Sequence, residues 1–137
     1  MERVALALAL IVVAVGAATL IRHRRKPAAP TRTGAATPEH LERVDFERPD
    51  APWLVVAFSS TSCLSCADTW EKVALLESGD VAVQDVSFQE HRELHERYGV
   101  HSVPLVLVVD ADGGVRATYL GPPTAADLWA KLAELRD

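Results

Sequence analysis

Residues 39–137 predict an α/β domain in which a mixed four-stranded sheet is flanked by helices. Four short apolar runs rich in β-branched residues are typical of strands, and they cover residues 53–58, 81–87, 105–109 and 115–120. Helical patterns follow three of these runs, at residues 67–77, at 90–98 and from 124 onward. A strand–helix–strand unit makes the first two strands parallel. A short loop rich in Asp and Gly makes the last two an antiparallel hairpin.

The ends of these elements carry recognisable signals. Gly79 follows the first helix and Gly99 closes the second, as glycines commonly do at helix C-termini. Thr124 and Asp127 resemble a capping box and start the last helix. Residues 39–46 are expected to add a short edge strand or a helical turn before the sheet.

An apolar stretch precedes the domain. Residues 4–21 carry no charge, and a basic cluster at 22–26 follows at once. About eighteen uncharged residues are the lower range for a bilayer span, so we expect residues 1–26 to form a single N-terminal transmembrane helix with a basic flank. A cleavable signal peptide is the alternative, but such peptides carry basic residues before the apolar run, where this chain has only Arg3 beside Glu2. The positive-inside rule then predicts a membrane location with the domain in the cytoplasm, and an exported or periplasmic face is the alternative.

Residues 27–38 are rich in proline, alanine and threonine, which predicts a semi-extended linker. Charge divides across this linker: residues 1–38 carry a net charge of +5 and residues 39–137 a net charge of −10, within a total of −5. The basic segment suits anionic lipid headgroups. An acidic domain without a basic stripe argues against a nucleic-acid partner.

The only two cysteines of the chain stand where a strand passes into a helix. Cys63 and Cys66 follow four small hydroxyl residues, 59–62. The free N–H groups and the dipole at a helix N-terminus favour an anion, and a thiolate is such an anion. Cys63 is therefore predicted to be a nucleophile, and Cys66, one turn later, is placed to resolve a mixed disulfide that Cys63 forms.

Val103 and Pro104 open another apolar strand, although a proline at the head of a buried strand is uncommon. Strand, Cys-x-x-Cys, helix, strand, helix, Val-Pro, strand, strand and helix follow one another over residues 50–137. This order resembles the thioredoxin family. The resemblance implies a thioredoxin-like fold and a cis peptide bond that sets Pro104 beside Cys63. It also implies that the backbone of Val103 binds the substrate chain.

Several positions depart from the usual thioredoxin pattern. Ser62 stands where the family has tryptophan, and Leu-Ser replaces Gly-Pro between the cysteines. Ala57 stands where classical thioredoxins bury an acid that accepts a proton from the second thiol. Asp85, on the next strand, aligns with a position that commonly holds lysine. We expect Asp85 to replace the missing acid and to serve Cys66, with a solvent-facing aspartate as the alternative.

Three histidines could act as metal ligands or as effectors of the cysteines. His91 and His95 are one helical turn apart, a spacing that could share a metal ion, but neighbouring Glu and Arg residues indicate a solvated helix face. His101 precedes Pro104 and could stabilise a thiolate when charged. An ordinary loop histidine is the preferred interpretation.

Together these patterns predict a membrane-tethered thiol–disulfide oxidoreductase that uses Cys63 and Cys66 to reduce protein disulfides. The partners implied are protein dithiol or disulfide substrates and a thiol electron donor, with no bound cofactor and no metal. Two alternatives remain: a redox-silent interaction module of the same fold, to which the departures point, and a metallochaperone. A zinc site is disfavoured because zinc needs four ligands and the chain has no second cysteine pair.

Overall fold

The structure, a computed structural model, describes residues 1–24 and 36–137, with side chains described up to residue 17 in the first segment. The chain divides into two compact units, Met1–Gly34 and Ala35–Asp137. The predicted linker at 27–38 lies almost entirely outside the described residues, so the proposed division at residues 26 and 39 stays a prediction.

The described part of the N-terminal unit forms the helix α1 (Glu2–Arg24). Nowhere in the described part of the chain does a helix combine the length and the hydrophobicity that a membrane crossing requires, so the transmembrane helix predicted for residues 1–26 is a wrong prediction. The physical reason is length. The uncharged stretch of α1, residues 4–21, rises about 27 Å at about 1.5 Å per residue, which falls short of a hydrocarbon core of about 30 Å. The predicted basic flank lies outside the described side chains, and the cellular location is not tested by the fold.

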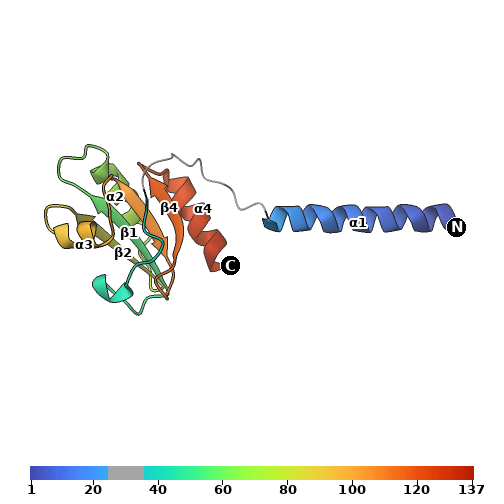
Figure 1. The fold of residues 1–137 in the computed structure, drawn as a ribbon, viewed down its shortest axis with the longest axis horizontal. Helices are drawn as coiled ribbons and strands as arrows, with labels where there is room; N and C mark the ends of the chain where they lie inside the picture. Colours follow the sequence, from blue (N-terminus) through green and yellow to red (C-terminus); the bar gives the residue numbers. More distant parts are fainter. Residues whose placement is uncertain (25–35) are drawn as a thin grey trace. The chain divides into compact units, whose positions relative to one another are not determined.

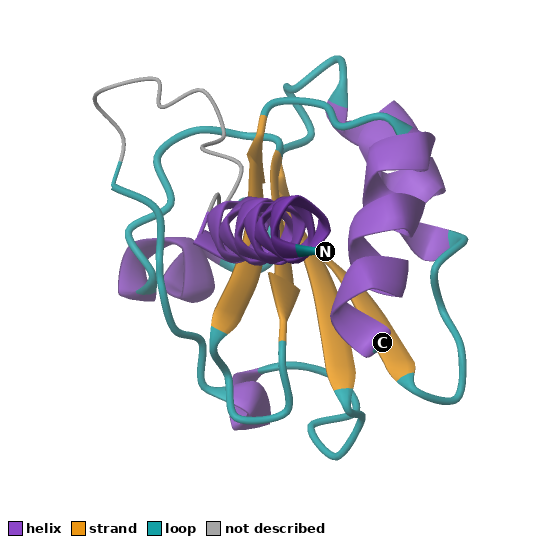
Figure 2. Cartoon of the chain, turned by 90° about the vertical axis from the view of Figure 1, so that its right-hand side faces the viewer, coloured by secondary structure: helices purple, strands orange, loops and turns teal. Residues whose placement is uncertain are grey.

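The second unit is built on a four-stranded sheet in the order β2-β1-β3-β4. Figures 1 and 2 show the sheet with helices beside it. Its strands are β1 (Trp53–Ser59), β2 (Val81–Ser87), β3 (Leu105–Val109) and β4 (Val115–Leu120). β1 pairs parallel with β2 and antiparallel with β3, and β3 pairs antiparallel with β4. The predicted mixed sheet is therefore confirmed.

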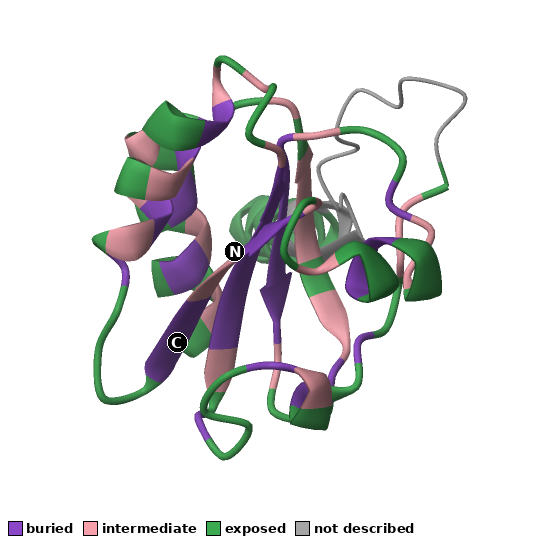
Figure 3. Cartoon of the chain, turned by 90° about the vertical axis from the view of Figure 1, so that its left-hand side faces the viewer, coloured by how far each residue is buried: buried purple, intermediate pink, exposed green. Residues whose placement is uncertain are grey.

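Burial explains why the central strands are continuously apolar. All five residues of β3 are buried, as are six of the seven in β1, because helices or loops cover both faces of these strands. The edge strand β4 has no buried residue: Arg116 and Leu120 are exposed and its other four residues are half-buried. Figure 3 shows the same contrast, with buried residues gathered on the inner strands and exposed residues on the outer helix surfaces.

Three helices flank the sheet: α2 (Cys66–Ala74), α3 (Arg92–Arg97) and α4 (Ala125–Arg136). Thr124 caps α4 by accepting a hydrogen bond from the Asp127 N–H at 3.1 Å, which confirms the predicted cap. α2 ends three residues earlier than predicted, because the chain tightens there into a turn in which Leu76 N–H bonds the carbonyl of Val73. Of the two features expected for residues 39–46, the helical turn is present as a 3₁₀ turn, η1 (Arg43–Asp45). In place of an edge strand there is an isolated bridge from His40 to Gly114.

The two faces of the sheet belong to two separate hydrophobic clusters, because side chains alternate along each strand. On one face, Val55, Ala57 and the β3 residue Val106 pack with residues of α2 and α4. On the other face, Phe58 and its neighbours pack with α3 and the segment before β1. Odd-numbered residues of β1 therefore point toward α2, which carries the second cysteine.

Truncation of a central strand residue tests this description. Leu107→Ala, in the middle of β3 with 0% exposure, is expected to lower the free energy of unfolding by about 2–5 kcal/mol, because it leaves a cavity between sheet and loops. Urea denaturation of the full chain measures this loss.

The matched control is Leu75→Ala, the same truncation at a residue with 68% exposure. It should change the free energy of unfolding by no more than about 0.5 kcal/mol. Equal losses for the two variants would contradict the assignment of Leu107 to the core.

Candidate active site

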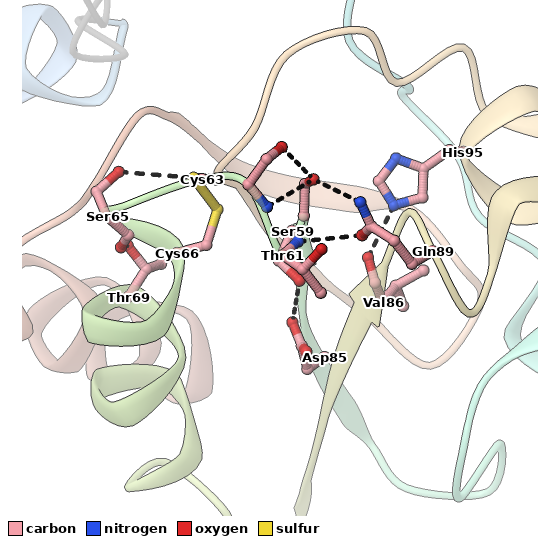
Figure 4. The surroundings of a disulfide bond; sticks show 12 residues. Ser59, Thr61, Cys63, Ser65, Cys66, Thr69, Asp85, Val86, Gln89 and His95 are labelled. Carbon is pink, nitrogen blue, oxygen red and sulfur yellow. Dashed lines mark hydrogen bonds between the residues drawn. A yellow bond between two sulfur atoms is a disulfide. The ribbon is translucent and has the colours of Figure 1, made fainter.

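The two cysteines lie where β1 gives way to α2 (Figure 4). Cys63 and Cys66 are joined in a disulfide with their Cα atoms 5.4 Å apart. Cys66 keeps 4% of its surface exposed, whereas Cys63 is only partly buried. An incoming thiol therefore reaches Cys63 more easily than Cys66. This difference is what the predicted division into nucleophile and resolving thiol requires.

Backbone hydrogen bonds hold the start of α2 in place. Cys66 is the first residue of the helix, one position earlier than predicted. Thr69 is fully buried and donates both its N–H, at 3.1 Å, and its hydroxyl, at 2.9 Å, to the carbonyl oxygen of Ser65. The Ser65 hydroxyl lies 3.8 Å from the Cys63 sulfur. A hydroxyl at this position can donate to the sulfur once it becomes a thiolate.

The Val103–Pro104 peptide bond is cis, as the resemblance implied. Pro104 is buried at the head of β3 and Val103 is partly buried against the core. The carbonyl oxygen of Pro104 accepts a hydrogen bond from the Gly121 N–H at 2.9 Å, which ties this segment to the end of β4. Binding of a substrate chain by Val103 and Pro104 stays a prediction.

A pocket of about 290 Å³ opens beside the disulfide and includes both cysteines. Asp85 is the one charged residue among those that line it; the others are Ser59, Ser60, Thr61, Ala67, Trp70 and Ser87. The Ser59 hydroxyl donates to Asp85 Oδ1 at 2.6 Å, as Figure 4 shows. The walls of the pocket are thus rich in hydroxyl groups and carry one carboxylate.

Strand register brings Asp85 to this pocket. Asp85 pairs with Ala57 across the parallel β1–β2 ladder, and Ser59 pairs with Ser87. Because Ala57 points toward α2, its register partner lies on the same face of the sheet. The Asp85 carboxylate therefore comes from β2, beside Ala57 of β1, and lies in the pocket that Cys66 lines. Its role as a proton acceptor stays a prediction.

Comparisons with known proteins decide the fold. No protein-family model and no curated protein matches the sequence. Among solved structures, the chain is similar to a variant thioredoxin from Halobacterium salinarum, with 23% identity and a TM-score of 0.58 over 74% of this chain and 95% of that chain. It is also similar to the germline-specific thioredoxin Deadhead from Drosophila melanogaster, with 24% identity and a TM-score of 0.56 over 73% of this chain and 98% of that chain. A malaria parasite thioredoxin-2 matches with 16% identity and a TM-score of 0.53, over 60% and 82% of the two chains.

The chain has a thioredoxin-like fold. Within that fold, two of the departures noted in the sequence fall on the accessible rim of the site. Ser62 is exposed and Leu64, between the cysteines, is 100% exposed. A serine and a leucine therefore border the disulfide of this thioredoxin-like domain and would meet an incoming substrate first.

The prediction that His95 lies on a solvated helix face was wrong. Its side chain is only 2% exposed, and its Nε2 donates to the carbonyl oxygen of Val86 at 2.8 Å. The ring meets Phe58 and Phe88 edge-on, with centroids 5.1 and 5.4 Å away. Within the described residues, no group of three potential metal ligands occurs. His95 is thus a core residue beneath the site, whereas His101 is exposed, as a loop histidine would be.

The sequence analysis also missed Ser59. The first strand was predicted to end at residue 58, but Ser59 is the last residue of β1 and is 7% exposed. Its odd number places it on the α2 face, next to Asp85. Strand alternation carried through to residue 59 would have revealed this position.

The buried imidazole makes a testable contribution to stability. His95→Leu removes a buried hydrogen bond to the Val86 carbonyl, so a loss of about 0.5–1.5 kcal/mol is expected. Guanidinium denaturation measures it. His91→Leu, one turn earlier on a less buried residue, serves as the control and should cost much less; a His95 variant as stable as that control would show that the bond to Val86 contributes nothing.

Proposed function

We propose that this domain is a thiol–disulfide oxidoreductase that reduces protein disulfides through Cys63 and Cys66. The observation that carries the proposal is a disulfide with one accessible and one buried sulfur at a helix N-terminus, in a thioredoxin-like fold. The proposal concerns the domain 39–137 and requires no cofactor beyond the two thiols.

The reaction proceeds in two exchanges. In the reduced domain, the Cys63 thiolate attacks one sulfur of a substrate disulfide, that S–S bond breaks, and the other substrate sulfur leaves as a thiolate. The Cys66 thiol then loses its proton and attacks the sulfur of Cys63, which releases the second substrate thiolate and forms the Cys63–Cys66 disulfide. Two electrons have passed to the substrate, and a thiol electron donor restores the dithiol by the same exchange in reverse.

Each step has a group suited to it. The positive end of the α2 dipole and the Ser65 hydroxyl stabilise the Cys63 thiolate. Asp85 is proposed to accept the proton of Cys66, because its carboxylate lines the same pocket and is held by Ser59. Val103 is proposed to pair its backbone with the substrate chain, and Pro104 to keep the approach to the sulfur free.

The redox potential tests the direction of the reaction. The full chain is equilibrated in glutathione buffers, and the fraction of Cys63–Cys66 disulfide is measured by alkylation and mass spectrometry. We expect a reversible two-electron transition at about −230 mV or lower, as in reductases.

Other results would change the proposal. A potential of about −120 to −180 mV would contradict a reductase and indicate an oxidant or isomerase. A pair that never re-forms its disulfide would exclude redox catalysis and leave an interaction module. Cys66→Ser provides the positive control, since it should trap the substrate as a mixed disulfide on Cys63.

The role of Asp85 is tested through pH. Asp85→Asn is expected to slow release of the mixed disulfide at neutral pH on the order of 10²-fold, because the Cys66 proton loses its acceptor. The defect should shrink as the pH rises, since hydroxide then removes the proton. Stopped-flow measurement of the second exchange between pH 6 and 10 follows both effects.

The matched control is Asp68→Asn, which removes an exposed carboxylate of α2 that pairs with Lys72. This substitution removes one negative charge near the two cysteines but outside the pocket. The pH dependence of the second exchange should therefore stay that of the unmodified protein. If Asp85→Asn also left the profile unchanged, Asp85 would not be the proton acceptor.

A further inference from the structure

The turn after β2 lies against the loop that carries Cys63. The Phe88 N–H donates to the carbonyl oxygen of Ser59 at 2.9 Å, continuing the β1–β2 ladder past the strand ends. The next residue, Gln89, is exposed, yet its side-chain amide folds back onto the Cys63 loop (Figure 4). Gln89 is not itself among the residues that line the Asp85 pocket, but it contacts Ser60 and Thr61, which are.

The amide of Gln89 makes two hydrogen bonds to this loop. Its Oε1 accepts from the Thr61 N–H at 3.0 Å, and its Nε2 donates to the Ser60 hydroxyl oxygen at 3.1 Å. Because a backbone N–H can only donate, the orientation of the amide is determined. One side chain thus binds both the backbone and a side chain of the loop.

The Ser60 hydroxyl joins this amide to the residue before the nucleophile. Its oxygen accepts from the Ser62 N–H at 3.3 Å as well as from Gln89. With both lone pairs occupied, its hydrogen is left to donate to the Ser62 hydroxyl, 3.0 Å away. The Ser60 carbonyl in turn accepts from the Cys63 N–H at 3.1 Å. Ser60 therefore joins Gln89 to Cys63, through its hydroxyl on one side and its backbone carbonyl on the other.

The backbone of Gln89 is itself held firmly. The N–H groups of Glu90 and His91 both donate to the carbonyl oxygen of Ser87, at 3.2 and 2.8 Å, and close the turn around Gln89. Phe88 packs edge-on against the buried His95, and the Arg92 guanidinium lies 4.7 Å from the centre of its ring. The amide thus reaches the loop from a fixed point on the sheet.

We propose that Gln89 is a positioning residue for Cys63, one that holds the loop 60–62 so that the sulfur stays at the N-terminal end of α2. Release of the loop lets the thiolate move away from the helix N–H groups, which stabilise it. The inference rests on the proposed function, because the position of Cys63 matters for catalysis only if its thiolate reacts.

The test measures alkylation of Cys63 by iodoacetamide as a function of pH, in the full chain carrying Cys66→Ala so that one thiol is read. Gln89→Ala and the similarly sized Gln89→Met should each move the midpoint of the profile to higher pH and reduce the rate at neutral pH by about threefold, the size of a typical hydrogen-bond contribution. Asp85 is the one charged group among the pocket residues, and it is the same in every variant.

The matched control is Gln84→Ala. Gln84 lies on β2 and accepts a backbone N–H, from Glu47 at 2.8 Å, but it points to the face away from the pocket. The pH profile of Cys63 alkylation in Gln84→Ala should equal that of the chain that carries only Cys66→Ala. Unchanged profiles for both Gln89 variants, or an equal shift for Gln84→Ala, would overturn the proposal.

A double-mutant cycle with Ser60→Ala tests the proposed chain of hydrogen bonds. The double variant with Gln89→Ala should shift the midpoint by less than the sum of the two single shifts, because Ser60 transmits part of the same effect. Additive shifts would overturn the connection. Failure of the proposed function would give a different result. The chain that carries only Cys66→Ala would then have a Cys63 thiol no more reactive than free glutathione, whether or not Gln89 alters it.

Discussion

The parallel pairing of β1 with β2 is the constraint on which the site depends. Its register places Asp85 beside Ala57 and Ser87 beside Ser59, so polar groups of two strands meet at the end of the sheet where α2 begins. One residue of slip would send these side chains to the opposite face, among the residues that pack on α3. The carboxylate lies in the pocket because the register is held by buried residues on both faces.

Burial on two faces in turn explains how a short helix can present the cysteines accurately. α2 packs Val73 onto the same cluster as Ala57 and the residues of α4. Cys66 is carried inward by its position in the first turn, while Cys63 remains in the loop before it. The unequal exposure of the two sulfurs follows from the place where the helix begins.

At this site polar residues hold the chain in place, as apolar residues do elsewhere in the domain. Nearly all the central strand residues are held by packing, but the loop 60–62 has no buried apolar side chain. Hydrogen bonds from Ser60 and from the turn after β2 order it instead. Such a loop keeps its shape while it leaves the sulfur of Cys63 open to a substrate.

The sequence predicted the local features well, since these depend on neighbouring residues. Strand positions, the helix cap at Thr124 and the placement of the cysteines at a helix start follow from composition and spacing, and the cis bond before Pro104 from the family resemblance. The failures have physical causes too. The apolar N-terminal stretch suggested a membrane span that the described helix does not provide, and polar neighbours concealed the burial of His95, because exposure depends on what α3 packs against.

The sequence by itself determined which residues could carry the chemistry: two cysteines at a helix N-terminus, a proline at a strand head and an aspartate on the neighbouring strand. Only the tertiary structure decided which groups meet. The hydrogen bond from Ser59 to Asp85 joins residues 26 positions apart, and that from Gln89 to Ser60 joins residues 29 positions apart. No local pattern records such contacts, because they form only when strand pairing brings separate segments of the chain together.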